Sequence, residues 1–189
     1  MDDLPLEILH EIAYNRHTYR ALLAVPKFAN SLTPSTRCDY MIRFGYCVEI
    51  TRNVIQWTLN GELHRTDGPA VITTNGIQMW WINSKLHRTD GPAVIYASGY
   101  QAWYIDGKRH RTDGPAMILA DGSQEWYIDG KCHRTDGPAV IDANGSQWWY
   151  INGKRHRTDG PARICANGTQ EWWIHDNQVT EQEFNNLKS

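Results

Sequence analysis

Residues 87–109, HRTDGPAVIYASGYQAWYIDGKR, contain the pattern that decides the fold. The motif HRTDGPA, which opens this stretch, begins five times at an interval of 23 residues, at His64, His87, His110, His133 and His156. A fixed interval of this size is typical of proteins built from stacked structural repeats. We therefore expect five copies of one unit, preceded by a degenerate copy that starts near residue 45.

Two turn signals recur within each period. Dipeptides such as Asn75-Gly76 form one series and dipeptides such as Asp106-Gly107 form the other, and both favour two-residue type I′ hairpin turns. Each period thus predicts two antiparallel strands, PAVIxA and QxWWI, with HRTD linking one hairpin to the next. The predicted fold is mainly β, an elongated array of antiparallel β-hairpins over residues 45–174. At about 4.8 Å per strand, the array would extend roughly 48 Å.

Two adjacent aromatic columns run through the copies, and strand geometry places them on opposite faces of the sheet. The first column is invariant and is interpreted as scaffold: Trp57, Trp80, Trp103, Trp126, Trp149 and Trp172. The second varies and is the candidate target or dimer face: Trp81, Tyr104, Tyr127, Tyr150 and Trp173. Met79 and its equivalents share this second face. With Asn75-Gly76 as the turn, Val71 is predicted to face Trp80. The alternative is that both columns pack only against the chain itself or a second copy.

The HRTDGPA motif contains residue types that occur in catalytic and metal sites, but its spacing indicates architecture. Copies about 10 Å apart cannot share one ion, because metal–ligand bonds are about 2 Å long. We expect Gly68 to supply backbone freedom, Pro69 an extended entry to the strand, and Asp67 an acceptor for backbone amides. The alternative is an anion-binding column formed by Arg65, Arg88, Arg111, Arg134 and Arg157.

Composition narrows the function classes. Nineteen Lys and Arg against 21 Asp and Glu leave a net charge of -2, which argues against a nucleic-acid or lipid partner. No apolar run approaches the roughly 20 residues of a membrane span, and the four cysteines show no metal or disulfide spacing. Motifs of nucleophilic, phosphate-binding or metalloprotease sites are absent from the sequence. We therefore predict a non-enzymatic binding or scaffold protein without cofactor or metal.

Both ends of the chain contain helix signals. Residues 1–44 predict a small cap of three short helices, begun by Asp3, Thr18 and Ser35, the last of which runs through TRCDYMIRF. Thr180 and Glu183 have capping-box spacing and predict a short helix through Leu187, so residues 175–189 are expected to cap the far end. With a stop at each end, we expect the chain to be complete.

The unit WWINSKLHRTDGPAVIYASGYQAW resembles the MORN repeat, a hairpin module of elongated single-layer β arrays. The resemblance covers about residues 46 to 174, and HRTDGPA is its consistent departure, a variant that looks like repeat arrays of Marseillevirus-type giant DNA viruses. It implies scaffolding, dimer formation and, in some members, contact with membrane lipid.

The opening segment LPLEIL, followed by LLAVPKFANSL, resembles an F-box. The resemblance implies docking on a Skp1-type adaptor of a ubiquitin ligase through Leu4, Pro5, Leu6, Glu7, Ile8, Leu9, Leu22 and Leu23. We therefore expect a viral adaptor in the host cell cytoplasm that recruits a ubiquitin ligase and holds a target on its array. The alternatives are a homodimeric structural protein, and phospholipid or nucleic-acid binding through the arginine column and a lysine column at Lys85, Lys108, Lys131 and Lys154.

Overall fold

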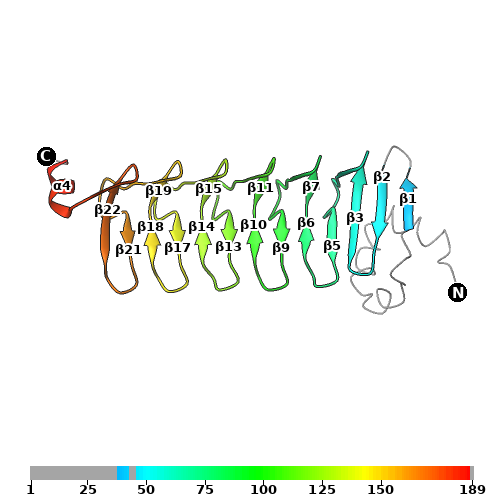
Figure 1. The fold of residues 1–189 in the computed structure, drawn as a ribbon, viewed down its shortest axis with the longest axis horizontal. Helices are drawn as coiled ribbons and strands as arrows, with labels where there is room; N and C mark the ends of the chain where they lie inside the picture. Colours follow the sequence, from blue (N-terminus) through cyan, green and yellow to red (C-terminus); the bar gives the residue numbers. More distant parts are fainter. Residues whose placement is uncertain (1–37, 43–45, 188–189) are drawn as a thin grey trace.

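The structure is a computed structural model that describes residues 38–42 and 46–187, with side chains from residue 48 onward. These residues form a long, single-layer β array (Figure 1). The main sheet is antiparallel, and its strands follow one another in space in the order β1 (Cys38–Ile42), β2 (Tyr46–Ile50), β3 (Val54–Leu59), β5 (Val71–Thr73), β6 (Gln78–Met79), β9 (Val94–Ile95), β10 (Gln101–Ala102), β13 (Met117–Ile118), β14 (Gln124–Glu125), β17 (Val140–Ile141), β18 (Gln147–Trp148), β21 (Arg163–Ile164), β22 (Gln170–Ile174) and β23 (Asn177–Val179). The predicted mainly β array of hairpins is confirmed.

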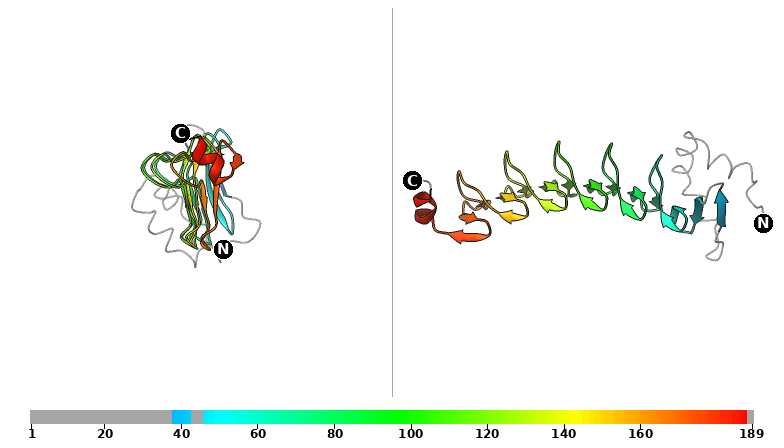
Figure 2. Two further views of the ribbon diagram at one scale, coloured as in Figure 1. Left: turned by 90° about the vertical axis from the view of Figure 1, so that its left-hand side faces the viewer. Right: turned by 90° about the horizontal axis from the view of Figure 1, so that it is seen from above.

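Each of the first four HRTDGPA copies contributes a second, smaller hairpin that leaves the main sheet. In these four copies the strand predicted as QxWWI is broken at its first tryptophan, so that Trp80 lies between β6 and the next strand. In the last copy the predicted strand is unbroken and forms β22. The small hairpins are β7 (Trp81–Ile82) with β8 (Lys85–Leu86), β11 (Tyr104–Ile105) with β12 (Lys108–Arg109), β15 (Tyr127–Ile128) with β16 (Lys131–Cys132), and β19 (Tyr150–Ile151) with β20 (Lys154–Arg155). They project from one side of the sheet and superimpose when the array is viewed end-on (Figure 2). In the degenerate copy, β4 (Glu62–Leu63) pairs directly with β3.

The two turn series differ in geometry. In the small hairpins both turn residues have positive φ, as at Asp106 (49°) and Gly107 (79°), so the predicted type I′ turns are confirmed there. In the main sheet only the glycine has positive φ, 84° at Gly76. There Gly76 N donates to Thr73 O, and Thr73 N donates to Ile77 O, both at 3.0 Å. This is a three-residue loop, a type I turn followed by a G1 bulge, and the type I′ prediction is wrong for this series.

The bulge residue also shifts the pairing. Val71 pairs with Met79 and Ile72 with Gln78, so the prediction that Val71 faces Trp80 is wrong. The predicted pairing occurs only in the degenerate copy, where Val48 pairs with Trp57. Neither Arg52 nor Asn53 has positive φ in that turn, which lacks the extra residue.

The side chains that are fully buried in this thin array are small, and backbone hydrogen bonds join each copy to the next. The alanines of the HRTDGPA motifs are 0% exposed: Ala70, Ala93, Ala116, Ala139 and Ala162. Trp80 N donates to Ala93 O of the next copy at 2.8 Å, and Gly107 N of one small hairpin donates to Leu86 O of the preceding one at 2.9 Å. The same two bonds recur along the array, so each copy is stabilised mainly by its neighbours, as in other repeat proteins.

The C-terminal end follows the sequence prediction. Helix α4 (Glu181–Asn186) begins at Thr180, whose side chain accepts from Glu183 N, while the Glu183 side chain accepts from Thr180 N. The predicted capping box is therefore confirmed. Phe184 anchors the helix and is only 3% exposed.

The N-terminal end differs in one respect. Residues 38–42, expected within a third helix, form strand β1, which pairs along its whole length with β2. That helix prediction is wrong because pairing to a neighbouring strand outweighs the weak local preference of a five-residue segment. The first two predicted helices and the adaptor-binding residues from Leu4 to Leu23 lie outside the described residues. Within the described part of the chain, no helix is long and apolar enough to cross a membrane.

Candidate protein-interaction surface

The two faces of the main sheet differ in how much the copies vary. We call the side that carries the first tryptophan column the invariant face. Its isoleucine, glutamine and tryptophan positions, represented by Ile72, Gln78 and Trp80, are identical in all five copies. We call the side that carries the second aromatic column the variable face. Its sheet positions read Val71, Val94, Met117, Val140 and Arg163 in one column, and Met79, Ala102, Glu125, Trp148 and Glu171 in the other.

On the invariant face, each arginine of HRTDGPA stacks on the tryptophan that precedes it. Cζ of Arg88 lies 3.9 Å from the centroid of the Trp80 ring. Its Nε donates to Asp90 Oδ1 at 2.8 Å and its Nη1 donates to the Pro92 carbonyl at 3.2 Å. The other four arginines of the predicted anion column stack at 4.0 to 4.1 Å from Trp57, Trp103, Trp126 and Trp149. These guanidinium groups therefore already have intramolecular partners, and their anion-binding role stays a prediction.

The stack explains the glycine and the aspartate of the motif. Gly91 does not have a left-handed φ, and a Cβ built on it would lie 3.0 Å from Arg88 Cζ. The glycine provides space for the guanidinium, which corrects the expected role of backbone freedom. Asp90 accepts mainly from the Arg88 side chain and, to a smaller extent, from its own backbone amide, the type of donor that the sequence indicated. The hydrogen bond from Arg88 lowers the pKa of Asp90, so the carboxylate stays ionised.

The motif histidines connect each copy to the next small hairpin. Nδ1 of His87 lies 2.9 Å from Oδ1 of Asp106, and Nδ1 of His110 lies 2.9 Å from Oδ1 of Asp129. At the last copy, His156 stacks on His175 with 4.0 Å between ring centroids, and His175 N donates to His156 Nδ1 at 3.3 Å. The motif histidines therefore hold the turns of the following hairpins in position. Among the described residues, no two motif histidines meet at one site.

The stacked histidine pair predicts that acid destabilises the last copy. Burial and the neighbouring His175 lower the pKa of His156. The unfolded chain therefore binds this proton more readily than the fold, so the stabilisation is complete above the ordinary histidine pKa of about 6.5 and is lost as the pH falls through the lower folded value. We expect the midpoint temperature of thermal unfolding to decrease when the pH is lowered from about 7.5 to about 5.5. The decrease should be smaller in His156→Gln. An identical fall in both proteins would contradict this assignment.

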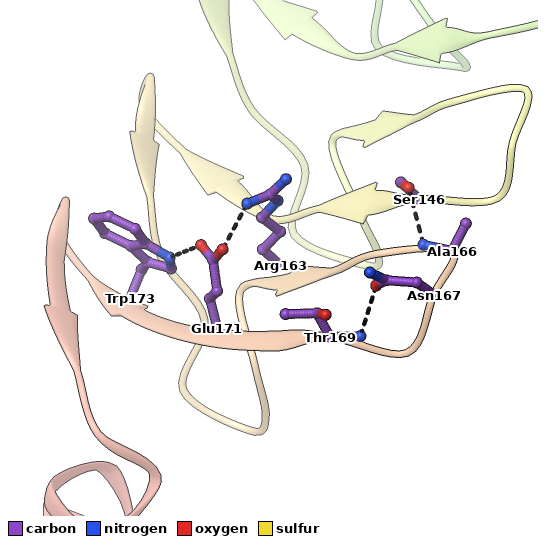
Figure 3. Close-up of polar contacts among 7 residues, drawn as sticks. All are labelled: Ser146, Arg163, Ala166, Asn167, Thr169, Glu171 and Trp173. Atoms are coloured by element: carbon purple, nitrogen blue, oxygen red, sulfur yellow. Dashed lines mark hydrogen bonds and ion pairs between the residues drawn. The ribbon is translucent and has the colours of Figure 1, made fainter.

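The variable face changes character along the array. Toward the N-terminal copies it is apolar: Val94, Ala102 and Met117 are buried, and Met79, Leu86, Tyr100, Tyr104 and Leu119 pack against them. Toward the C-terminal copies it is polar. Tyr127 Oη donates to Glu125 Oε2 at 2.8 Å, and Glu171 lies between Arg163 and the Trp173 ring nitrogen, which donates to Oε2 at 3.0 Å (Figure 3).

The second aromatic column lies on this face as a row of half-buried rings, one per copy. Tyr104 packs in one cluster with Ala102, so the expectation that this column shares a face with Met79 and its equivalents is confirmed. Burial raises the pKa of Tyr127 to about 12, so its hydroxyl is a neutral donor. Tyr96, at the loop end of the same face, is a large apolar residue with 38% exposure.

The small hairpins add side chains that the sequence analysis did not assign to this surface. Arg109 Nε donates to Tyr104 Oη at 3.3 Å, and the Arg109 guanidinium lies 5.1 Å from the Tyr127 ring centroid. Leu86 and Cys132 hold the equivalent position in other copies, and burial raises the pKa of the Cys132 thiol to about 12. The sequence contained one signal for these residues: the residue type at this position of the period differs between copies, as it does in the second aromatic column.

Comparisons with protein-family models and with curated proteins found no match to this chain.

Proposed function

We propose that this chain is a non-enzymatic interaction scaffold that holds a protein target on its variable face. The observation that carries the proposal is the contrast between the faces. The invariant face repeats one arginine–tryptophan stack, whereas the variable face presents a different set of side chains in each copy. A surface without translational repetition suits a partner of one defined shape.

The chemistry of the variable face favours a protein partner. Half-buried tyrosine, tryptophan, methionine and arginine side chains are the types enriched at protein interfaces. The apolar cluster around Met117 would supply buried contacts, and the polar region around Glu171 and Arg163 would supply orientation. The adaptor half of the proposal derives from the F-box-like segment: it recruits a Skp1-type adaptor in the cytoplasm of an infected cell, while the array holds the target.

The test of target binding compares a change on the variable face with a change at an exposed position outside it. Tyr104→Asp combined with Met117→Asp places charges in the apolar region of the variable face, and we expect at least tenfold weaker recovery of bound target in quantitative affinity capture. Thr112→Asp is the matched control, because Thr112 is exposed within an HRTDGPA motif. Equal recovery by wild type and the double variant, with both proteins folded by circular dichroism, would refute the proposed face.

The adaptor half has its own test. Leu6→Asp combined with Ile8→Asp would abolish capture of a purified Skp1-type adaptor if the F-box-like segment docks on it. Undiminished capture would contradict docking through these residues. Sedimentation at micromolar concentration separates the alternative of a homodimer, which would sediment at twice the monomer mass.

A further inference from the structure

The main sheet ends at an edge that one more copy would cover. Gln170 and Glu171, the first residues of β22, pair with Ile164 and Arg163 of β21 on one side. On the other side, β23 pairs only with the later residues Trp172–Ile174. In the preceding copy the equivalent residues Gln147 and Trp148 pair with the following strand, at Ile164 and Arg163. Among the described strands, none covers the outer side of Gln170 and Glu171.

The backbone of Gln170 points toward this open edge. Cys165 N donates to Thr169 O at 2.8 Å, so this pair occupies a hydrogen-bonded position of the hairpin. Residues of an antiparallel pair alternate between bonded and non-bonded positions, which turns the N–H and C=O of Gln170 away from β21. Consistent with this, the Gln170 residue is exposed, whereas its four equivalents from Gln78 to Gln147 are half-buried.

A groove of about 410 Å³ lies along this edge, and its lining is acidic. Glu171, Glu181 and Glu183 line it together with Gln170, Trp172 and Thr180, and no lysine or arginine of the described residues does. Hydrogen bonds from Thr180 lower the pKa of Glu183, so this carboxylate is ionised at neutral pH. Because Glu171 is paired with Arg163, the negative charge beside the free strand edge comes from Glu181 and Glu183.

We propose that this edge binds an extended, basic segment of another protein, which adds to the sheet as its next strand. Edge pairing supplies affinity through main-chain hydrogen bonds, and side-chain positions supply specificity. The array itself shows which side chains fit, because the residue opposite the glutamine is isoleucine between all inner copies: Ile95, Ile118, Ile141 and Ile164. A basic residue opposite Glu171 would lie beside the acidic lining of the groove, although Glu171 itself already bonds to Arg163 and Trp173. The array's own sequence Arg163-Ile164 has this order, a basic residue followed by isoleucine. The proposed edge site does not depend on the target proposed for the variable face.

The probe is a fluorescein-labelled peptide, HRTDGPARI, which copies residues 156–164. We expect the full-length chain to bind it with a dissociation constant on the order of 10 to 100 μM, a range that corresponds to a modest binding free energy. A peptide with glutamate in place of the second arginine would bind at least fivefold more weakly. Failure of the wild-type chain to bind the probe below millimolar concentration would overturn the proposal.

Two pairs of variants of the chain distinguish strand pairing at this edge from non-specific electrostatic attraction of the peptide. Gln170→Pro removes the outward N–H and leaves the bonds to β21 intact, because Gln170 occupies a non-bonded position there. We expect at least tenfold weaker binding, whereas Gln170→Ala keeps the N–H and binds like wild type. Glu181→Lys would weaken binding several-fold, and Glu62→Lys, the same charge change at the exposed residue of β4, would not. Equal binding by folded Gln170→Pro and Gln170→Ala would contradict strand addition.

Discussion

Trp126→Ala is expected to lower the free energy of unfolding by about 3 kcal/mol, at the lower end of the range for buried aromatic residues because the ring is half-buried. The ring lies 4.1 Å from the Arg134 guanidinium. Its loss leaves Arg134 and Asp136 without the surface that orders them. Neighbouring copies depend on one another, so the middle of the array is the most sensitive place for this change.

Chemical denaturation followed by tryptophan fluorescence and circular dichroism measures this effect. Thr112→Ala is the control, because Thr112 is exposed, and surface substitutions of this kind change stability by less than about 0.5 kcal/mol. A loss in Trp126→Ala no larger than that of the control would show that the first tryptophan column does not support the array.

Gly114→Ala is expected to destabilise the fold by about 1 to 3 kcal/mol, the usual cost of inserting an atom into a well-packed place. The new Cβ would lie 3.0 Å from Arg111 Cζ. Arg111 has little freedom to move, because it stacks on Trp103, donates to Asp113 and donates to the Pro115 carbonyl. The substitution therefore displaces the guanidinium or distorts the entry to β13.

A double-mutant cycle identifies the cause. In an Arg111→Ala background the space beside Gly114 is empty, so adding the alanine there should cost less than about 0.5 kcal/mol. If the glycine were required for backbone conformation instead, Gly114→Ala would cost the same in both backgrounds, and the stacking explanation would be wrong.

The sequence predicted the parts of the fold that repetition makes visible. A period of 23 residues with two turn signals indicated two hairpins per copy, and the capping box at Thr180 and Glu183 indicated the last helix. The contrast between an invariant and a varying aromatic column also indicated which face to consider as the interaction surface. These features depend on residue type and spacing alone.

Other features depend on geometry that residue type does not determine. The pair Asn75-Gly76 is compatible with a type I′ turn and with a type I turn plus bulge, and the choice shifts the strand pairing by one residue. An invariant glycine such as Gly91 signals either unusual backbone or close approach, and only the position of Arg88 distinguishes them. The segment Cys38–Ile42 is too short for its apolar pattern to separate strand from helix.

Deletion of residues 110–132 tests the central claim that 23 residues form one interchangeable structural step. The deletion removes one period and joins Arg109 to His133, which restores the same local sequence as Arg109-His110. Small-angle X-ray scattering should show a folded array whose maximum dimension is about 10 Å shorter than that of the full chain, the width of two strands. An unfolded chain, or a folded one of unchanged length, would contradict the repeat architecture.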